Sequence, residues 1–214
     1  MLPSQAEIDA LDLQIARVHA ATGVRVVAAE IGKADTYEEL PWKAFALGAS
    51  FAALAMAGTD ALCPRCATQH LTVLSAAIAL AAGALAALFT IYVPAFGRLF
   101  LHAAKCELEV GQYAQALFLR RELFDTPHRD AVLILVSRFE RRVHILPDTG
   151  LRNAVGQAAW QVVIERMKPA LRQSRTADAL QAGIAAVEEL LVRTGYQGGA
   201  GSGPSDPLIV EKGA

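Results

Sequence analysis

Residues 130–137 read DAVLILVS, a continuous apolar run with the length of a β-strand. It lacks the polar alternation of a half-exposed strand, so it predicts a central strand that is buried on both faces. A second strand is expected over residues 141–146, joined to the first as a hairpin by the short turn at residues 138–140. The polar segment Pro147-Asp148-Thr149-Gly150 closes this second strand. The hairpin is the centre of the expected domain.

Helical patterns follow and precede this hairpin. A helix is predicted at about residues 104–123, and two more carry apolar faces within residues 155–167 and 180–191. Pro169 should break or kink the first of these two, and Thr176 should cap the second. The order of elements predicts a layered α/β domain.

The N-terminal segment adds a helix and a strand. Ser4 followed by Glu7 is a capping-box pattern, and Gly23 supplies a helix stop. Residues 23–31 then have the β-branched density of a strand. Helix and strand therefore precede the apolar segments described next.

Two stretches, Ala44–Thr59 and Leu71–Gly97, contain no Asp, Glu, Lys or Arg. The longer one would rise roughly 40 Å as a helix, which exceeds a hydrocarbon core of about 30 Å. The shorter one also reaches across if Trp42 anchors it at the membrane interface. We expect a transmembrane helical hairpin over residues 42–97.

This hairpin interrupts the domain and divides the chain into four segments. The first part of the domain is residues 1–41 and the second is residues 98–195, while residues 196–214 contain too few apolar residues to fold. Two crossings return the chain to the side from which it started. Flanking cations lie almost all on the domain side, with Arg65 alone in the interhelical loop. The charge asymmetry predicts a multi-pass protein of a bacterial inner (plasma) membrane with a cytoplasmic domain.

Composition agrees with a membrane segment joined to a polar domain. Hydrophobic residues make up 54% and charged residues 19% of the 214 residues, and the net charge is -1. The sequence has no dense Lys/Arg patch interleaved with aromatic residues, so nucleic acid is not an expected partner. The lipid bilayer is the partner that the composition predicts.

Three segments carry a family resemblance. Residues 21–27 (ATGVRVV) resemble the Thr-(Ser)-Gly-Glu-Ile-x-Val-Val opening of TPM-domain proteins, with Val24 in place of the usual acidic residue. Asp35-Thr36-Tyr37, with Trp42, resembles the polar-aromatic segment that follows this opening. Residues 130–151 (DAVLILVSRFERRVHILPDTGL) resemble the central signature, an apolar strand ending in Val-Ser, then Glu-Arg, then a strand ending in Asp-x-Gly. Hydrophobic helices between the first strand and the second helix resemble the bacterial membrane subgroup of this family.

The resemblance implies an α/β/α sandwich, in agreement with the layered domain derived above. It also implies several functions, because acid phosphatase activity and divalent-cation binding are reported for some members, while others act in photosystem repair or as auxiliary membrane proteins. Membership does not choose among these functions. It favours Asp35 and Asp148 as candidates for binding Ca²⁺ or Mg²⁺, because both lie in family-like segments.

Carboxylates at loop positions are the first candidates for chemistry, and they are Asp35, Asp125, Asp130, Asp148 and, in the hairpin turn, Glu140. Carboxylates gathered near strand ends can bind a hard cation, which in turn can hold a phosphate. Structural roles compete with this interpretation: Asp148 can cap a helix, Asp35 fits a turn, and Glu140 can pair with a neighbouring arginine. Both interpretations stay open.

Cys63-Pro64-Arg65-Cys66, with His70 further on, is a second candidate. A Cys-x-x-Cys before a helix can have a thiolate stabilised by the helix N-terminus and by Arg65, as redox exchange requires. The two cysteines and His70 could also share a helical face as three zinc ligands, without a fourth in the loop. An inert disulfide or a pair of free thiols fits the motif as well. Cys106 is expected to be a small core residue.

The function expected from these observations is that of a binding or assembly module without catalysis of its own. It would be displayed in the cytoplasm by the membrane hairpin; the sequence does not identify its partner, for which a membrane protein is one candidate. A divalent-cation-dependent phosphatase using Asp35 and Asp148 is one alternative, although the sequence has no Gly-rich phosphate cradle and no activated nucleophile. Thiol exchange or metal binding at the outer loop, with Cys63 as the attacking residue, is the other.

Overall fold

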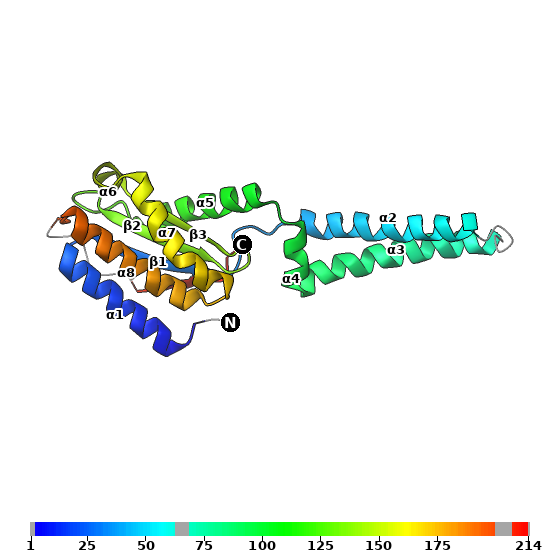
Figure 1. Cartoon of the computed structure of the whole chain (residues 1–214), viewed down its shortest axis with the longest axis horizontal. Coiled ribbons are helices and arrows are strands. Elements are labelled where there is room, and N and C mark those ends of the chain that lie inside the picture. Colours follow the sequence, from blue (N-terminus) through cyan, green and yellow to red (C-terminus); the bar gives the residue numbers. More distant parts are fainter. Residues whose placement is uncertain (1–2, 63–68, 200–206, 214) are drawn as a thin grey trace. The chain divides into compact units, whose positions relative to one another are not determined.

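The computed structural model describes residues 3–62, 69–199 and 207–213. The chain divides into two compact units. One unit, here called the sheet domain, consists of Met1–Asp35 and Ala104–Ala214, and the other, the hairpin unit, consists of Thr36–Ala103 (Figure 1). Each unit is described by itself below.

A mixed four-stranded sheet forms the centre of the sheet domain, with the strand order β3-β2-β1-β4. The strands are β1 (Arg25–Ile31), β2 (Ala131–Ser137), β3 (Arg142–Pro147) and β4 (Ile209–Glu211). β1 lies parallel to both β2 and β4, whereas β3 is antiparallel to β2. The sequence predicted the hairpin of β2 and β3 correctly. It also predicted β1, the strand that precedes the apolar stretches.

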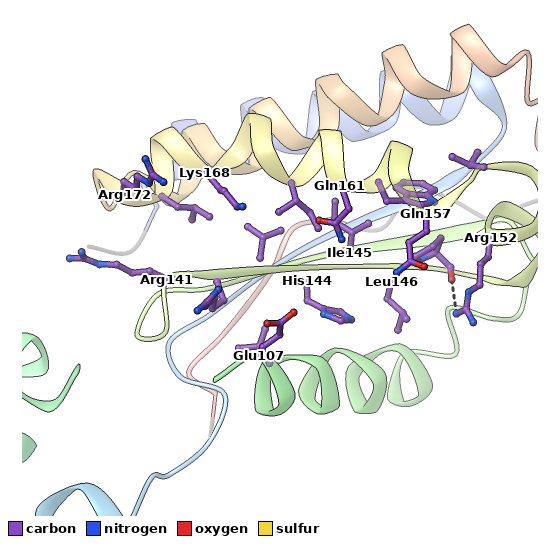
Figure 2. A pocket seen from close by; sticks show the side chains of 18 residues that line it. Glu107, Arg141, His144, Ile145, Leu146, Arg152, Gln157, Gln161, Lys168 and Arg172 are labelled. Atoms are coloured by element: carbon purple, nitrogen blue, oxygen red, sulfur yellow. Dashed lines mark hydrogen bonds between the residues drawn. The ribbon is translucent and has the colours of Figure 1, made fainter. Parts of the chain in front are cut away.

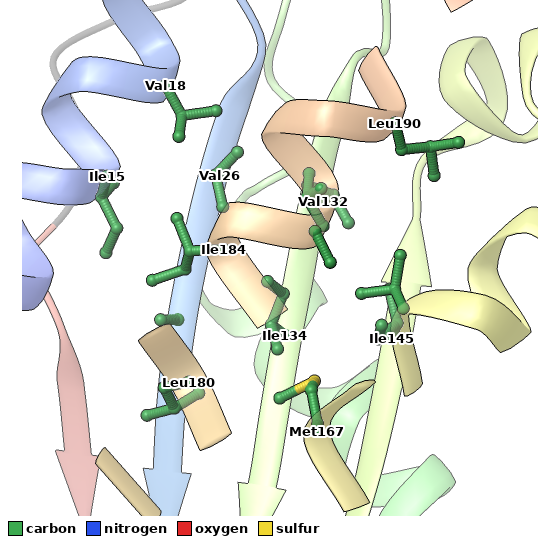
Figure 3. Close-up of a cluster of buried hydrophobic side chains, with 14 of the residues drawn as sticks. Ile15, Val18, Val26, Val132, Ile134, Ile145, Met167, Leu180, Ile184 and Leu190 are labelled. Atoms are coloured by element: carbon green, nitrogen blue, oxygen red, sulfur yellow. The ribbon is translucent and has the colours of Figure 1, made fainter. Parts of the chain in front are cut away.

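Helices cover both faces of this sheet. One face carries α1 (Gln5–Thr22), α6 (Thr149–Ala154), α7 (Gln157–Arg172) and α8 (Thr176–Thr194), and the other carries α5 (Ala103–Arg120). Side chains of β2 alternate between the two cores, with Ile134 in the first (Figure 3) and Leu133 in the second. All seven residues of β2 are buried. The fold is a small α/β domain with helices on both faces of its sheet.

The helix ends follow the sequence patterns except at Thr176. Ser4 and Glu7 form the capping box of α1, and Gly23 ends that helix in the left-handed conformation. Thr176 is the first residue of α8 and Arg175 is its cap residue, so the expected Thr176 cap is wrong. Pro169 lies inside α7, which continues to Arg172.

The prediction of an unfolded tail is wrong for residues 207–213. Leu208 and Ile209 are buried, and residues 209–211 pair with β1 as strand β4. The Glu211 carboxylate accepts hydrogen bonds from the Tyr113 hydroxyl at 2.7 Å, from Arg120 at 3.1 Å and from Arg121 at 3.2 Å. The free edge of β1 and these three donors, all distant in sequence, hold a segment whose own composition predicts no structure.

The hairpin unit contains two long helices, α2 (Glu39–Leu62) and α3 (Gln69–Tyr92), followed by the short helices α4 (Pro94–Gly97) and η2 (Arg98–Phe100). Glycines allow the two long helices to approach closely. A Cβ atom added at Gly48 would lie 2.9 Å from the Cβ of Ala86, and one added at Gly83 would lie 2.9 Å from the Phe45 ring. Small residues at such contacts are typical of paired apolar helices.

Two segments of this unit, Glu39–Thr59 and Val73–Tyr92, are long and apolar enough to cross a membrane. Large apolar side chains point away from the unit, among them Phe51 and Leu54, which are 74% and 72% exposed. In water, this much exposed apolar surface would be unfavourable. Length and composition are thus compatible with the predicted spans.

We expect Glu211→Gln to loosen β4. The pKa of Glu211 is lowered, chiefly because Tyr113 donates a hydrogen bond to it and then because Arg121 and Arg120 lie beside it. Its stabilising effect is fully present above the ordinary carboxyl pKa of 4.5 and is lost as the pH falls through the lowered folded-state value. Near neutral pH the variant should lose about 1 kcal/mol of unfolding free energy.

Thermal unfolding followed by circular dichroism as a function of pH tests this expectation. The difference between wild type and variant should shrink as the pH is lowered below 4.5. Glu122→Gln, at an exposed position outside the strands, is the matched control and should unfold with the wild type. A difference that is absent at neutral pH would show that Glu211 does not hold β4.

Candidate functional site

The two predicted cation ligands lie at opposite ends of the sheet. Asp148 follows β3, and its N–H donates to the Ala131 carbonyl at the start of β2. Asp35 follows the end of β1, next to Ala34, whose N–H donates to the Glu140 carboxylate beyond the end of β2. The seven residues of β2 separate these ends by about 20 Å. The structure therefore does not bring Asp35 and Asp148 to one ion.

Each of these two carboxylates has a cationic neighbour. Asp148 is buried and caps α6 by accepting a hydrogen bond from the Thr149 N–H at 2.7 Å. Its other oxygen lies 3.1 Å from Nε of Arg129. Asp35 forms an ion pair with Lys105 at 3.7 Å. Each of the two carboxylates is therefore paired with a cation of the protein itself.

The remaining predicted carboxylates also have structural partners or lie in solvent. Asp130 is buried and accepts a hydrogen bond from the Gly199 N–H at 2.9 Å. Glu140 is buried and accepts hydrogen bonds from the Ala34 N–H, at 2.9 Å, and from the Ser137 hydroxyl. Asp125 is exposed. Within residues 3–62, 69–199 and 207–213, no group of three or more His, Cys, Asp or Glu side chains could hold a metal ion.

Sequence reasoning missed the buried carboxylate of Glu30. This side chain is fully buried in β1 and lies 3.2 Å from Nε of Arg138. Burial raises the pKa of Glu30, against the smaller opposing effects of a hydrogen bond with Thr176 and the charge of Arg138. An acid within the apolar run VVAAEI was the available signal. Its partners join the end of β1 to the hairpin turn and to α8.

The thiol candidates are only partly within the described chain. Cys63 and Cys66 lie outside the described residues. His70 belongs to the first turn of α3, but its side chain also lies outside the description. Cys106 is buried on α5, in agreement with a core role.

A groove in the sheet domain runs along β3, between α7 and α5 (Figure 2). Its cavity volume is about 810 Å³, within the range of ligand sites. Figure 2 shows Gln157, Gln161 and Lys168 extending from α7 on one side of the strand and Glu107 from α5 on the other. The described residues that line the groove include no Ser, Thr, Cys or Asp. The described lining of the groove thus offers no hydroxyl or thiol nucleophile.

Basic side chains dominate the charge of this groove. Its lining contains one acid, Glu107, and five cations, which are Arg141, Arg142, Arg152, Lys168 and Arg172. Figure 2 shows Arg141, Lys168 and Arg172 toward one end of the groove and Arg152 at the other. The pKa of the half-buried His144 is lowered by burial, with only a partial opposing effect from Glu107, which favours the neutral imidazole.

The cations at one end of the groove are not all neutralised. Among the described residues, no carboxylate forms an ion pair with Arg141, Arg142 or Arg172. Lys168 does pair with Glu165 on its own helix. An anionic ligand would therefore meet positive charge that the protein itself leaves uncompensated.

Backbone groups of β3 face into the same groove. The Asp148 N–H donates to the Ala131 carbonyl, so these two residues form a hydrogen-bonded antiparallel pair. Because such pairs alternate along a ladder, the register makes Leu146 and His144 bond to β2 and leaves Val143 and Ile145 facing outward. The Pro147 carbonyl also faces outward and accepts a hydrogen bond from Arg152 at 3.3 Å. Among the strands that the structure describes β3 is outermost, so no described strand pairs with its other edge.

The family model that matches the chain describes the TPM domain, and the match covers residues 81–190. The chain belongs to the TPM-domain family. The matched range contains β2, β3, α5, α6 and α7 and most of α8, and it starts within α3. β1 and β4, which complete the sheet, lie outside it. No curated relative matches the chain.

A solved structure shares this fold. The BA42 protein from the psychrophilic bacterium Bizionia argentinensis, determined by NMR, matches with a TM-score of 0.57 and 11% sequence identity. The match covers 99% of this chain and 96% of that protein. At this identity the likeness concerns the fold alone.

The role of Asp148 as a cap gives a prediction about stability. Asp148→Ala removes the cap of α6 and leaves Arg129 without its partner, so it should lower the unfolding free energy by about 1–2 kcal/mol. Asp148→Asn should lower the unfolding free energy by less than Asp148→Ala does, because asparagine also caps helices. Asp35→Asn affects an ion pair that is partly exposed to solvent and should cost less than Asp148→Ala. Denaturant unfolding of the three variants measures the order, and a larger loss for Asp35→Asn would contradict it.

Proposed function

We propose that the protein is a membrane-anchored binding module, in which α2 and α3 cross the membrane and the TPM domain holds a partner. The observation that carries the proposal is the groove along β3, which combines an outermost strand edge, a lining of mixed polar and apolar side chains, and uncompensated positive charge. These features bind a ligand without transforming it. The partner proposed for a domain held at a membrane surface is another membrane protein.

The membrane assignment rests on the two apolar segments of the hairpin unit. Each contains 20 or 21 residues, which rise about 30 Å as a helix and match the hydrocarbon core. Exposed large apolar side chains, such as Phe51 and Val73, support contact with lipid. Cations on the domain side, against the single Arg65 of the interhelical loop, favour a cytoplasmic sheet domain in a bacterial inner membrane.

A divalent-cation-dependent phosphatase remains the competing function, because of the activity reported for some members of the family. The geometry described above gives it less support. Asp35 and Asp148 lie at opposite ends of the sheet, and each has a protein cation beside it. A divalent cation bound by either Asp35 or Asp148 would need its remaining ligands from groups other than the second of these carboxylates.

Turnover measurements separate the two functions. We expect the purified full-length protein, in detergent with Mg²⁺ or Ca²⁺, to hydrolyse a phosphate ester such as p-nitrophenyl phosphate only at the background rate. The double variant Asp35→Asn with Asp148→Asn should change stability more than turnover. If cation-dependent turnover is present in the wild type and absent in the double variant, at an unchanged melting temperature, the protein is a phosphatase and the module proposal is wrong.

Cysteine labelling tests the topology. In sealed cells, a membrane-impermeant maleimide should modify Cys63 or Cys66 after reduction. Ala185→Cys places a thiol at an exposed position of α8, and in a Cys63→Ser, Cys66→Ser background it should react only after the membrane is opened. Cys106 is buried and provides a low background. Labelling of Ala185→Cys in sealed cells would overturn the cytoplasmic assignment.

A further inference from the structure

We infer that the β3 groove binds an acidic, extended segment of a partner protein, which adds to the sheet as a further strand next to β3. The inference rests on the proposed binding function and specifies the chemistry of the partner. Its basis is the coincidence of three features in one groove: outward backbone groups, side walls on both faces of the sheet, and an excess of cations.

The backbone of β3 supplies the recognition that any extended segment can use. Val143 and Ile145 each direct an N–H and a carbonyl away from β2, as the register requires. An added strand can pair with these four groups irrespective of its side chains, and such pairing is a recurring mode of peptide recognition. Pro147 has no N–H, so the donors for pairing end at Ile145. The open segment therefore selects a short stretch of the partner.

The walls of the groove define where the partner's side chains lie. β3 contains six residues and is about 20 Å long. Alternate side chains of an added strand point to opposite faces, so one set would meet α7 at Gln161 and Ile164, and the other would meet α5 at Glu107 and Val110. A helix on each side of the edge thus turns an open strand into a groove with two walls.

Charge selects an acidic partner. The groove lining carries five cations against one acid, although the whole chain has a net charge of -1. Arg141, Arg142, Lys168 and Arg172 belong to the end where β3 begins and α7 ends. Acidic side chains on the added segment would pair with this cluster, and like charges would reject a basic one.

The same charge argues against a second copy of the chain as the occupant. Symmetric antiparallel pairing of two β3 strands would place Arg142 of one copy near Pro147 and Arg152 of the other. Cations would then face each other at both ends of the interface. Basic side chains also protect natural edge strands from pairing with other strands. The experiment below distinguishes this protective role of the cations from a role in binding an acidic segment.

A defined peptide tests the inference on the full-length protein in detergent. The probe is a fluorescein-labelled hexapeptide of alternating Glu and Val, and its fluorescence anisotropy reports binding. The matched peptide of alternating Lys and Val should bind at least tenfold more weakly. Two further versions of the Glu/Val peptide carry N-methyl groups on alternate amides, in either register. One version should lose binding at least tenfold and the other should not, because only alternate amides of an added strand face β3.

Charge reversal tests the location. Arg141→Glu combined with Arg172→Glu changes two exposed side chains of the groove. This double change should lower the affinity for the Glu/Val peptide at least tenfold. Arg17→Glu changes an exposed cation on α1, outside the groove, and should leave binding within twofold. Melting temperatures of the variants verify that they fold, and the N-methyl comparison uses the wild type and is independent of folding defects.

Several results would overturn the inference. One is that the Glu/Val peptide does not bind. Another is that both N-methylated peptides lose affinity equally, or that neither loses affinity. A third is that Arg17→Glu weakens peptide binding as much as the double change Arg141→Glu with Arg172→Glu. If anionic vesicles bind to the groove cations and the peptide does not, the ligand of these cations is lipid. If the protein self-associates through β3 in a concentration-dependent way, the occupant of the edge is a second copy of the chain. Both would contradict an acidic peptide partner. None of these results would change the turnover or labelling outcomes, so the module proposal can stand or fail separately.

Discussion

The sheet domain depends on the burial of β2 between two cores. Every residue of this strand is removed from solvent, because α5 covers one face and α1, α7 and α8 cover the other. A strand buried on both faces must be paired on both edges, since an unpaired N–H or carbonyl in the interior costs free energy. β1 satisfies one edge in parallel, and β3 satisfies the other in antiparallel. The position of β3 beside β2 follows from this requirement.

That position is also the origin of the groove. In the described part of the chain no strand lies beyond β3, so the backbone groups that do not bond to β2 face outward. The edge at β4 differs, because Glu211 is held there by Tyr113, Arg120 and Arg121 and thereby neutralises two cations. Among the cations at the β3 edge, Lys168 pairs with Glu165, whereas no described carboxylate forms an ion pair with Arg141, Arg142 or Arg172. The two edges of one sheet therefore present different chemistry to a partner.

Local patterns predicted the elements whose structure depends on nearby residues. The capping box at Ser4, the buried run of β2 and the α/β class could all be read from the sequence, because neighbours within a few residues determine them. β4 could not, since its partners are the edge of β1 and side chains of α5 that lie about a hundred positions away. Asp35 and Asp148 lie in family-like segments, but the antiparallel course of β3 sends them to opposite ends of the sheet. A pattern of residue types carries no information on that direction, and it also did not reveal the groove, whose walls come from two separate helices.

The parallel pairing of β1 with β2 has a consequence for the order of synthesis. Arg25 pairs with Ala131, and the hairpin unit is made between them. A ribosome adds about 5–20 residues per second, so roughly 5–20 s pass between completion of β1 and the start of β2. During that interval the two long apolar helices of the hairpin unit are made, while β1 has neither of its sheet neighbours. Assembly of the sheet is therefore a late event that follows synthesis of the hairpin unit, and the nascent chain carries an unpaired β1 strand until β2 arrives.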